Sequence, residues 1–295
     1  MIRPVVPEAD KLIGMKRPVL QHGYVALVDY MGNDGAIVQA ARVSYGRGTK
    51  TVRDDRGLIR YLLRHRHTTP FEMVEYKFLV RLPIFVARQW IRHRASSTNE
   101  YSARYSVVPD EFEVPPPDEV RLQSTRNRQG RGGPLPKEVV ERFRSDLERI
   151  AKESYVAYSA ALDAGVARET ARLVLPVAYY TQWYWKVNLW NLFHFLSLRL
   201  DAHAQEEIRL YAAELAGLAR IVAPVAFEAF DEFMLEGVSF SRREQRALRA
   251  LLEGQTPETA CALAGLPLTR DDGKRMSTGE GAEFLDKLDR VRRLE

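Results

Sequence analysis

The sequence predicts a mixed α+β fold, in which a few strands are combined with long amphipathic helices. Residues 23–31 are predicted to be a strand because they are β-branched and aromatic and have a glycine at each end, and residues 73–82 because they alternate in polarity. From residue 137 onward the apolar side chains recur with the period of about 3.6 residues that is typical of helices. The last 60 residues contain three short charged segments that begin with helix-start signals, which predicts a small helical extension.

The N-terminal half holds, in order, a helix at 34–43, a helical segment at 53–66, a break at 67–72 and a helix at 84–93. Asp34 is the residue type that begins a helix, and Pro83 is placed to begin the last of these segments. Pro70 disfavours a helical conformation in the residue before it, so we expect the chain to leave the helix there.

The second half is predicted to be mainly helical. The expected elements are a loop or partly ordered insert at 109–136, a helix from 137 to about 165, a short helix before Pro176, a long helix over about 178–199 and another that continues to about Pro224. The insert is rich in Pro, Gly and Arg, and its charge is most simply a solvated surface. Asp201 is a candidate cap for the helix that follows it.

The extension has three helical segments of its own. The first spans 241–253, the second begins at Thr256-Pro257-Glu258, and Ser277 and Thr278 precede the last. A helix-turn-helix DNA reader is conceivable but has no support in the sequence, so we favour packing or an oligomer contact. Residues 236–295 are accordingly predicted to be a helical extension of unknown role, separate from residues 1–235.

The composition is that of an ordinary folded protein. Of 295 residues, 45% are hydrophobic and 28% are charged, which excludes intrinsic disorder and collagen. The single cysteine excludes an internal disulfide and a CxxC metal cluster, which favours the reducing cytoplasm. No secretory signal or membrane-length apolar stretch is found, so we expect a cytoplasmic protein without a membrane partner.

The positive charge comes mostly from arginine. The formal net charge is only +5, but 35 of the 44 basic residues are arginine. The planar, forked guanidinium suits phosphates and carboxylates, so anionic substrates and nucleic acid are both candidate ligands. Genome composition or a hot habitat also enriches arginine, and this explanation is expected to hold for most of the 35.

Several common catalytic motifs are missing. The chain has no GxGxxG after a strand, no GxxxxGK[ST] and no GxSxG. The single cysteine, Cys261, lies on a predicted helix of the extension, where a buried small residue is expected rather than a nucleophile.

Two residue pairs that contain histidine are candidate metal ligands. His65 and His67 are two residues apart, and His203 precedes Glu207 by four, the spacing of two ligands on one helix face. No third ligand with matching geometry is evident, so hydrogen bonding is the favoured role and no metal is expected. A metal hydrolase that uses His203 and Glu207 is kept as one functional hypothesis.

The sharpest functional signal is the segment 89–106. It combines three Arg, one His, one Glu and several hydroxyl side chains after the end of a predicted helix, where it becomes a loop. Its arginines could clamp phosphates, and Glu100 and Ser102 could bind a ribose or a phosphate. The alternative is a salt-bridged loop at a charged helix end, which the mixture of residue types makes less favoured.

Around this segment the chain resembles a known family. Arg92-His93-Arg94, followed after seven residues by Ser102, is similar to the signature of the flavin-dependent thymidylate synthases. Other blocks that match in family order are ARVSYGR at 41–47, HTTPFE at 67–72, PIFVARQWIRHR at 83–94, ETARLVLP at 169–176 and FLSLRLDAHAQEEI at 195–208. The resemblance runs from about residue 23 to 235, which implies that residues 1–235 are the catalytic domain.

The resemblance implies a fold and a reaction. The fold would be a curved, largely antiparallel sheet packed with helices. The enzyme would be a methyltransferase that converts dUMP to dTMP, with methylene-tetrahydrofolate as carbon donor and NADPH as reductant through a bound FAD. It would be a homotetramer whose active sites form between subunits. The aromatic run from Trp183 to Phe193 agrees loosely with such contacts, although ordinary core is the alternative for it.

The resemblance also implies the site residues. Those expected at the flavin are Thr69, Arg92, His93, Arg94, Glu100, Asn188, Leu189, Trp190 and His194, with Ser44 and His67 lining that region or the folate site. Those expected at dUMP are Gln89, Trp90, Ile91, Arg92, Glu100, Tyr101, Ser102, Ala103, Arg104, Arg172 and Arg199. Arg199 is the expected catalytic residue, because a guanidinium beside the uracil would favour negative charge at N3 and O2.

This chain departs from the family pattern at two site positions. His194 stands where many members have Asn, and Ala103 replaces the usual Gly before Arg104. The insert at 109–136 and the residues after 235 go beyond the compact family core.

The main alternative is an arginine-rich nucleic-acid-binding protein that uses 92–104 and the C-terminal residues. The sequence has no recognised nucleic-acid module and its net charge is small, so we expect no nucleic-acid partner.

Overall fold

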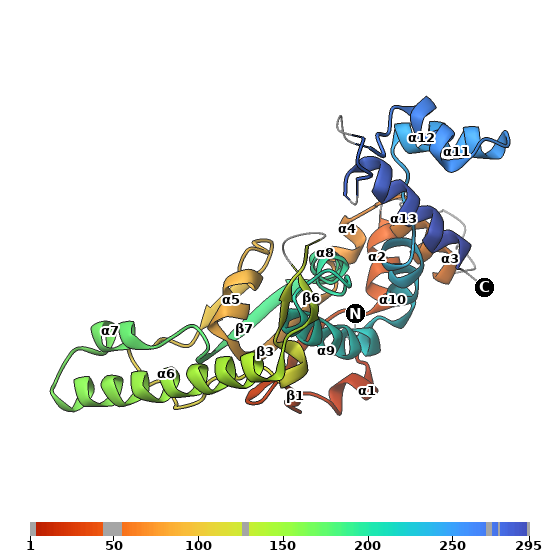
Figure 1. The fold of residues 1–295 in the computed structure, drawn as a ribbon. Helices are drawn as coiled ribbons and strands as arrows, with labels where there is room; N and C mark the ends of the chain where they lie inside the picture. Colours follow the sequence, from red (N-terminus) through yellow and green to blue (C-terminus); the bar gives the residue numbers. More distant parts are fainter. Residues whose placement is uncertain (1–3, 44–54, 126–129, 270–272, 277, 294–295) are drawn as a thin grey trace. The chain divides into compact units, whose positions relative to one another are not determined.

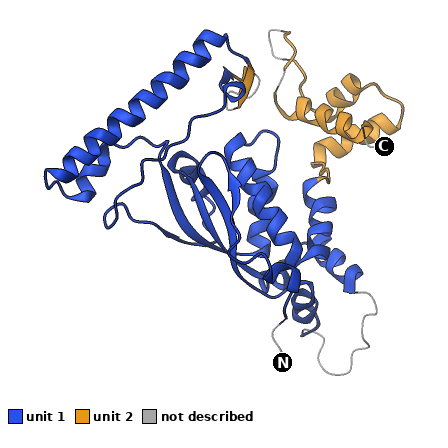
Figure 2. Ribbon diagram, turned by 90° about the horizontal axis from the view of Figure 1, so that it is seen from below, with its two compact units in different colours: residues 1–122, 134–235 blue, residues 123–133, 236–295 orange. Residues whose placement is uncertain are grey.

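The computed structural model describes residues 4–43, 55–125, 130–269, 273–276 and 278–293. The chain forms two compact units, coloured separately in Figure 2: the main unit, residues 1–122 and 134–235, and the C-terminal unit, residues 123–133 and 236–295. No helix in the described ranges is both long and apolar enough to cross a membrane.

A five-stranded sheet forms the centre of the main unit (Figure 1). Its strands, in spatial order, are β1 (Arg17–Val19), β2 (Gly23–Met31), β3 (Glu75–Pro83), β7 (Tyr180–Asn188) and β4 (Ser97–Glu100). Each strand pairs antiparallel with its neighbour. The predicted α+β fold with a largely antiparallel sheet is therefore confirmed, and β2 has the bounds that the sequence predicts.

The predicted helix over 178–199 is wrong in its first half. Residues Tyr180–Asn188 form strand β7, and only Leu189–Arg199 form a helix, α8. Along β7, Trp183 and Trp185 are buried while Tyr184 between them is 43% exposed, which is the alternation of a strand with one covered face. Asn188 ends the strand and also caps α8, since its side chain accepts a hydrogen bond from the Asn191 N–H at 2.9 Å.

Helices of the main unit form its core together with the sheet. They are α2 (Asp34–Val43), α3 (Asp55–Arg64), α5 (Ile84–Trp90), α8, α9 (Glu206–Val222) and α10 (Pro224–Phe230). Trp90 packs edge-on against Trp185 with ring centroids 5.1 Å apart, and Phe193 stacks on Phe230 at 4.4 Å. Much of the aromatic run from 183 to 193 is thus core of its own subunit, as the alternative interpretation held.

Two shorter predictions also need correction. The expected break at 67–72 contains a one-turn helix, α4 (Thr69–Glu72). Pro70 lies in its first turn, where a missing N–H costs no hydrogen bond. Helix α9 begins at Glu206 and not after Asp201, whose carboxylate accepts a hydrogen bond from the His203 N–H at 2.7 Å instead.

The insert at 109–136 is more ordered than predicted. Its described elements are a 3₁₀ turn (Pro117–Glu119) and the hairpin strands β5 (Arg121–Gln123) and β6 (Arg131–Pro134). The 27-residue helix α6 (Lys137–Asp163) follows as predicted, and then α7 (Arg168–Ala171) with a 3₁₀ turn (Arg172–Val174). Tyr158 of α6 packs with Val108, Ala171 and Tyr179 in a second apolar cluster of the main unit.

Four elements of the main unit lie where no element was predicted, namely the short helix α1 (Pro7–Asp10), strand β1, helix α10 and a π-helical turn (Asp231–Leu235) that continues α10.

The C-terminal unit has its own small core. Helix α11 (Arg242–Leu252) begins with a capping box between Ser241 and Glu244, α12 (Pro257–Ala264) begins after Thr256, and α13 (Glu280–Arg292) completes the unit. Cys261 is fully buried among apolar residues, as predicted. All three predicted helices are confirmed, although Ser277 lies outside the described residues.

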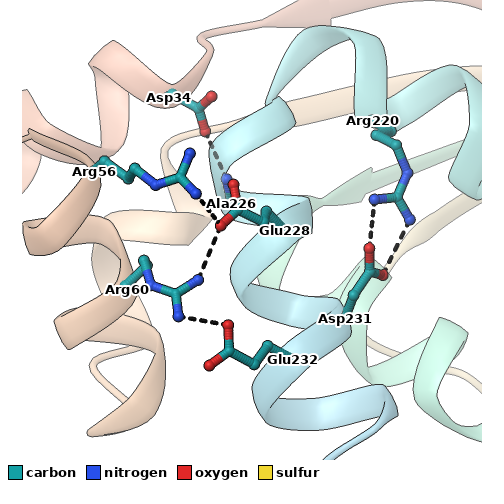
Figure 3. Close-up of polar contacts among 8 residues, drawn as sticks. All are labelled: Asp34, Arg56, Arg60, Arg220, Ala226, Glu228, Asp231 and Glu232. Carbon is teal, nitrogen blue, oxygen red and sulfur yellow. Dashed lines mark hydrogen bonds and ion pairs between the residues drawn. The ribbon is translucent and has the colours of Figure 1, made fainter. Parts of the chain in front are cut away.

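Asp34 links two helices of the main unit and supports a stability prediction. Its carboxylate accepts hydrogen bonds from the N–H groups of Val225 and Ala226, both at 2.9 Å, so it caps α10 from another element. Figure 3 shows the contact with Ala226. Burial raises the pKa of Asp34, so desolvation offsets part of this gain. We expect Asp34→Ala to lower the free energy of unfolding by about 1–2 kcal/mol, measured by urea denaturation.

Arg56→Ala is the matched control for this measurement. Arg56 pairs with Glu228 of the same helix on the surface (Figure 3), and an exposed ion pair contributes less than about 1 kcal/mol. Equal losses for the two variants would contradict the capping role of Asp34.

Candidate active site

The segment with the strongest sequence signal joins α5 to the edge strand of the sheet. Helix α5 ends at Trp90, residues 91–96 form a turn, and residues 97–100 form β4. A loop was predicted for residues 97–100. Trp185 donates an indole hydrogen bond to Ser96 Oγ at 2.9 Å, and Ser96 Oγ donates to the His93 carbonyl at 3.1 Å. These bonds tie the turn to β7.

The first of three relevant hollows is the arginine–histidine cavity, of about 430 Å³. Its lining includes Arg92, His93, Arg94, Asn191, His194 and Arg199. Five of these residues were predicted as site residues, whereas Asn191 was not. The structure therefore brings the two ends of the predicted site, 92–94 and 194–199, together in one cavity.

His93 and Arg199 form a hydrogen-bonded pair in this cavity. Arg199 Nε donates to His93 Nε2 at 3.0 Å. Burial, with help from the Arg199 and His194 charges, lowers the pKa of His93 to about 4. His93 is therefore neutral near pH 7, with its ring proton on Nδ1, since Nε2 must carry the accepting lone pair.

The cavity is electropositive. Burial lowers the pKa of Arg199, but an arginine stays charged at any physiological pH. Arg92 and Arg94 are exposed and make no hydrogen bond or ion pair with the described residues. With His93 neutral, the cavity offers three guanidinium groups to an anionic ligand.

The second hollow, the β4–β7 cavity, has a volume of about 340 Å³. Its polar lining residues are Glu100, Tyr101, Ser102, Arg172, Tyr180 and Thr181, and Ala103 also lines it. Glu100 accepts a hydrogen bond from Thr181 Oγ1 at 2.6 Å. Four predicted dUMP-binding residues of the loop thus meet Arg172 from a distant block, while Tyr180 and Thr181 were missed.

Arg104 stands apart from this cavity. Its guanidinium forms an exposed ion pair with Glu169 at 2.9 Å, and its N–H donates to Ser102 Oγ at 3.3 Å. Because an exposed ion pair is weak, the guanidinium can be released to an anionic ligand at small cost. Its predicted contact with dUMP stays a prediction.

The third hollow, the α2–α4 cavity, is the largest, at about 890 Å³. Thr69 and His67 line it together with apolar side chains such as Tyr61 and Met73. Ser44, which was predicted to line the same region, lies outside the described residues. The three cavities share no lining residue.

Besides Arg104, six predicted residues line none of these three cavities: Gln89, Trp90, Ile91, Asn188, Leu189 and Trp190. Trp90 and Leu189 are almost fully buried, and the Leu189 N–H donates to the Val74 carbonyl at 2.8 Å, so neither residue presents a surface to a ligand in the single chain. Gln89 Oε1 is buried and has no hydrogen-bond partner among the described residues, which leaves an acceptor open to a ligand.

The structure removes the premise of a metal site at His203 and Glu207. His203 precedes α9 and is exposed, with its ring paired to Asp201 at 2.9 Å, whereas Glu207 is buried within the helix. The two are therefore not on one helix face. No group of three or more His, Cys, Asp or Glu that could hold a metal occurs in the described residues.

Sequence comparison gives a consistent set of relatives. The family model described as thymidylate synthase complementing protein matches residues 26–225. A flavin-dependent thymidylate synthase of Rickettsia conorii is 48% identical over 273 residues, covering 88% of this chain and 93% of that protein. One of Gluconobacter oxydans is 51% identical over 257 residues, covering 86% of this chain and 85% of that protein.

The extension is partly shared with these relatives. Residues 236–295 are about a fifth of the chain, which is more than the part that the match to the Rickettsia conorii protein leaves uncovered.

A solved structure has the same fold. The UMP/dUMP methylase PolB from Streptomyces cacaoi, bound with 5-Br dUMP, matches with a TM-score of 0.66 at 37% identity, covering 74% of this chain and 99% of that chain. The family model and the curated relatives each span most of this sequence, and the signature triplet Arg92-His93-Arg94 lines the arginine–histidine cavity. The chain belongs to the flavin-dependent thymidylate synthase family.

Proposed function

We propose that this protein methylates dUMP at C5 to give dTMP, taking the carbon from methylene-tetrahydrofolate and the reducing equivalents from NADPH through FAD. The observation that carries the proposal is the arginine–histidine cavity, which joins the signature triplet 92–94 to Arg199 from a segment about 100 residues later. A flavin-dependent relative at 48% identity supports the same reaction.

FAD fits the donor set of this cavity. The guanidinium groups of Arg92 and Arg94 have no partner among the described residues. A guanidinium can bind two phosphate oxygens at once through two parallel N–H groups, which suits the diphosphate of FAD. The further proposed contacts are Thr69, Glu100, His194 and residues 188–190. The chemistry that FAD supplies when bound is the transfer of reducing equivalents from NADPH to the pyrimidine carbon.

We assign dUMP to the β4–β7 cavity, together with Gln89, Trp90, Ile91, Arg92, Arg104 and Arg199. Arg172 and Ser102 suit the phosphate, and Glu100 is an acceptor for a sugar hydroxyl. The solved relative PolB is described with 5-Br dUMP bound, which supports a pyrimidine monophosphate at this fold.

Arg199 is the proposed catalytic residue. Hydrogen bonding to His93 fixes its Nε, so its terminal nitrogens remain available to the substrate. A positive charge held beside N3 and O2 of uracil favours negative charge there, which raises the electron density at C5. Because Arg199 is half-buried, less water screens its charge than on an open surface.

The proposal includes a homotetramer in the cytoplasm. The residues of the predicted site are divided among three cavities without shared lining residues, which is expected if several copies of the chain complete one site. We place the catalytic residues in 1–235 and assign no role to the extension at 236–295.

The test is an anaerobic assay of the purified full chain. We expect a yellow protein whose flavin spectrum bleaches with NADPH, and dTMP when dUMP and methylene-tetrahydrofolate are added. A colourless protein that cannot be reconstituted with FAD, and that binds DNA or RNA with steep salt dependence, would instead establish the nucleic-acid alternative.

A further inference from the structure

Thr181 is a buried polar residue of the central sheet that lines the β4–β7 cavity. It is 7% exposed and lies on β7, between β3 and β4. Its hydroxyl donates to Glu100 Oε1 at 2.6 Å. The resemblance to the family assigns no role to this residue.

The contact follows from the register of the sheet. Glu100 is paired with Trp183, so Thr181 is its diagonal neighbour on the same face of β7. The Tyr101 N–H donates to the Gln182 carbonyl at 2.8 Å, which holds the end of β4 against β7 at this point. The backbone therefore fixes both residues before any ligand is present.

The Thr181 hydroxyl restricts the orientation of the Glu100 carboxylate. An ionised carboxylate has two acceptor oxygens, and Thr181 engages Oε1, so Oε2 remains for a ligand. Arg172 lines the same cavity, and an unrestrained Glu100 could turn toward its guanidinium. Such an ion pair would cancel the positive charge that a phosphate needs.

We propose that Thr181 is a positioning residue for dUMP, which acts by holding Glu100 so that Oε2 faces the substrate and Arg172 stays free for the phosphate. The inference rests on the proposed function, since it takes the β4–β7 cavity as the nucleotide site. It adds a residue of β7 to a site otherwise built from the loop after α5 and the segment before Pro176.

The test compares Thr181→Val with Thr181→Ser in the flavin-loaded full chain. Valine keeps the shape but removes the hydroxyl, and a hydrogen bond to a charged group is strong enough that we expect KM for dUMP to rise about tenfold, with kcat within about twofold. Serine keeps the donor and should restore KM. Calorimetric titration with dUMP should show the same shift in Kd.

A double-mutant cycle separates positioning from general damage to the sheet. If Thr181 acts through Glu100, then Thr181→Val adds little to the loss already caused by Glu100→Gln. Additive losses, or equal losses in the Val and Ser variants, would overturn the inference.

A failure of the proposed function would give a different result from a failure of the role of Thr181. A wild-type protein that neither binds dUMP in the titration nor forms dTMP overturns both proposals. A wild-type protein that does both, with an unchanged Kd in Thr181→Val, overturns only the role of Thr181.

Discussion

Replacing Arg199 with alanine is expected to lower the rate of dTMP formation by roughly a thousandfold, while NADPH still reduces the flavin. The guanidinium is proposed to stabilise charge that develops on the pyrimidine, so its loss affects methylation and not the reduction of the cofactor. The measurement is single-turnover dTMP formation, with flavin bleaching followed separately in the same preparation.

Two variants make this result specific. Arg199→Lys keeps a positive charge but lacks the guanidinium, which can donate to His93 through Nε and face the substrate with its terminal nitrogens at the same time. We therefore expect partial activity. Arg220→Ala removes an arginine that is paired with Asp231 and lines none of the three cavities, so activity should be retained. Normal dTMP formation by Arg199→Ala would remove the catalytic assignment.

The strands that could be predicted are those with clear limits in the sequence. β2 is a short β-branched and aromatic run between Gly23 and Gly32, and β3 alternates in polarity and ends at Pro83, so both could be recognised. β7 could not, because no glycine or proline separates it from α8 and Asn188 belongs to both elements. β4 consists of four exposed polar residues, and only its pairing with β7 makes it a strand.

The site residues divide in the same way, into those that local sequence reveals and those that only the folded structure brings together. The triplet 92–94 and the loop to Arg104 could be found because their chemistry is concentrated in one segment. Thr181 and Asn191 were missed because each is unremarkable in sequence and acquires a partner or a cavity only through the sheet. The grouping of predicted residues into three cavities likewise depends on packing that no local pattern encodes.

His93→Leu is expected to lower kcat for dTMP formation about ten- to a hundredfold, because it leaves a half-buried Arg199 donor without its acceptor. His93→Gln is the matched variant, since its amide oxygen can take the place of Nε2 and should recover much of the rate. Flavin binding is measured in parallel, because His93 is also a predicted flavin contact and a lost cofactor would lower the rate for a different reason.

The same histidine gives a pH dependence with a defined sign. Its pKa is about 4 in the folded chain and 6.5 in an unfolded one, so between these values the unfolded state binds more protons. The free energy of unfolding should therefore rise with pH through this window, and the contribution of His93 should be complete above pH 6.5. In His93→Gln the rise should be smaller, as measured by urea denaturation at several pH values.

Activity should follow the folded-state value. Because His93 stays neutral until the pH approaches 4, protonation of His93 should produce no loss of kcat near pH 6.5. A fall in kcat near pH 6.5 that disappears in His93→Gln would show that His93 is protonated in the working enzyme, and its role as the acceptor for Arg199 would then have to be abandoned.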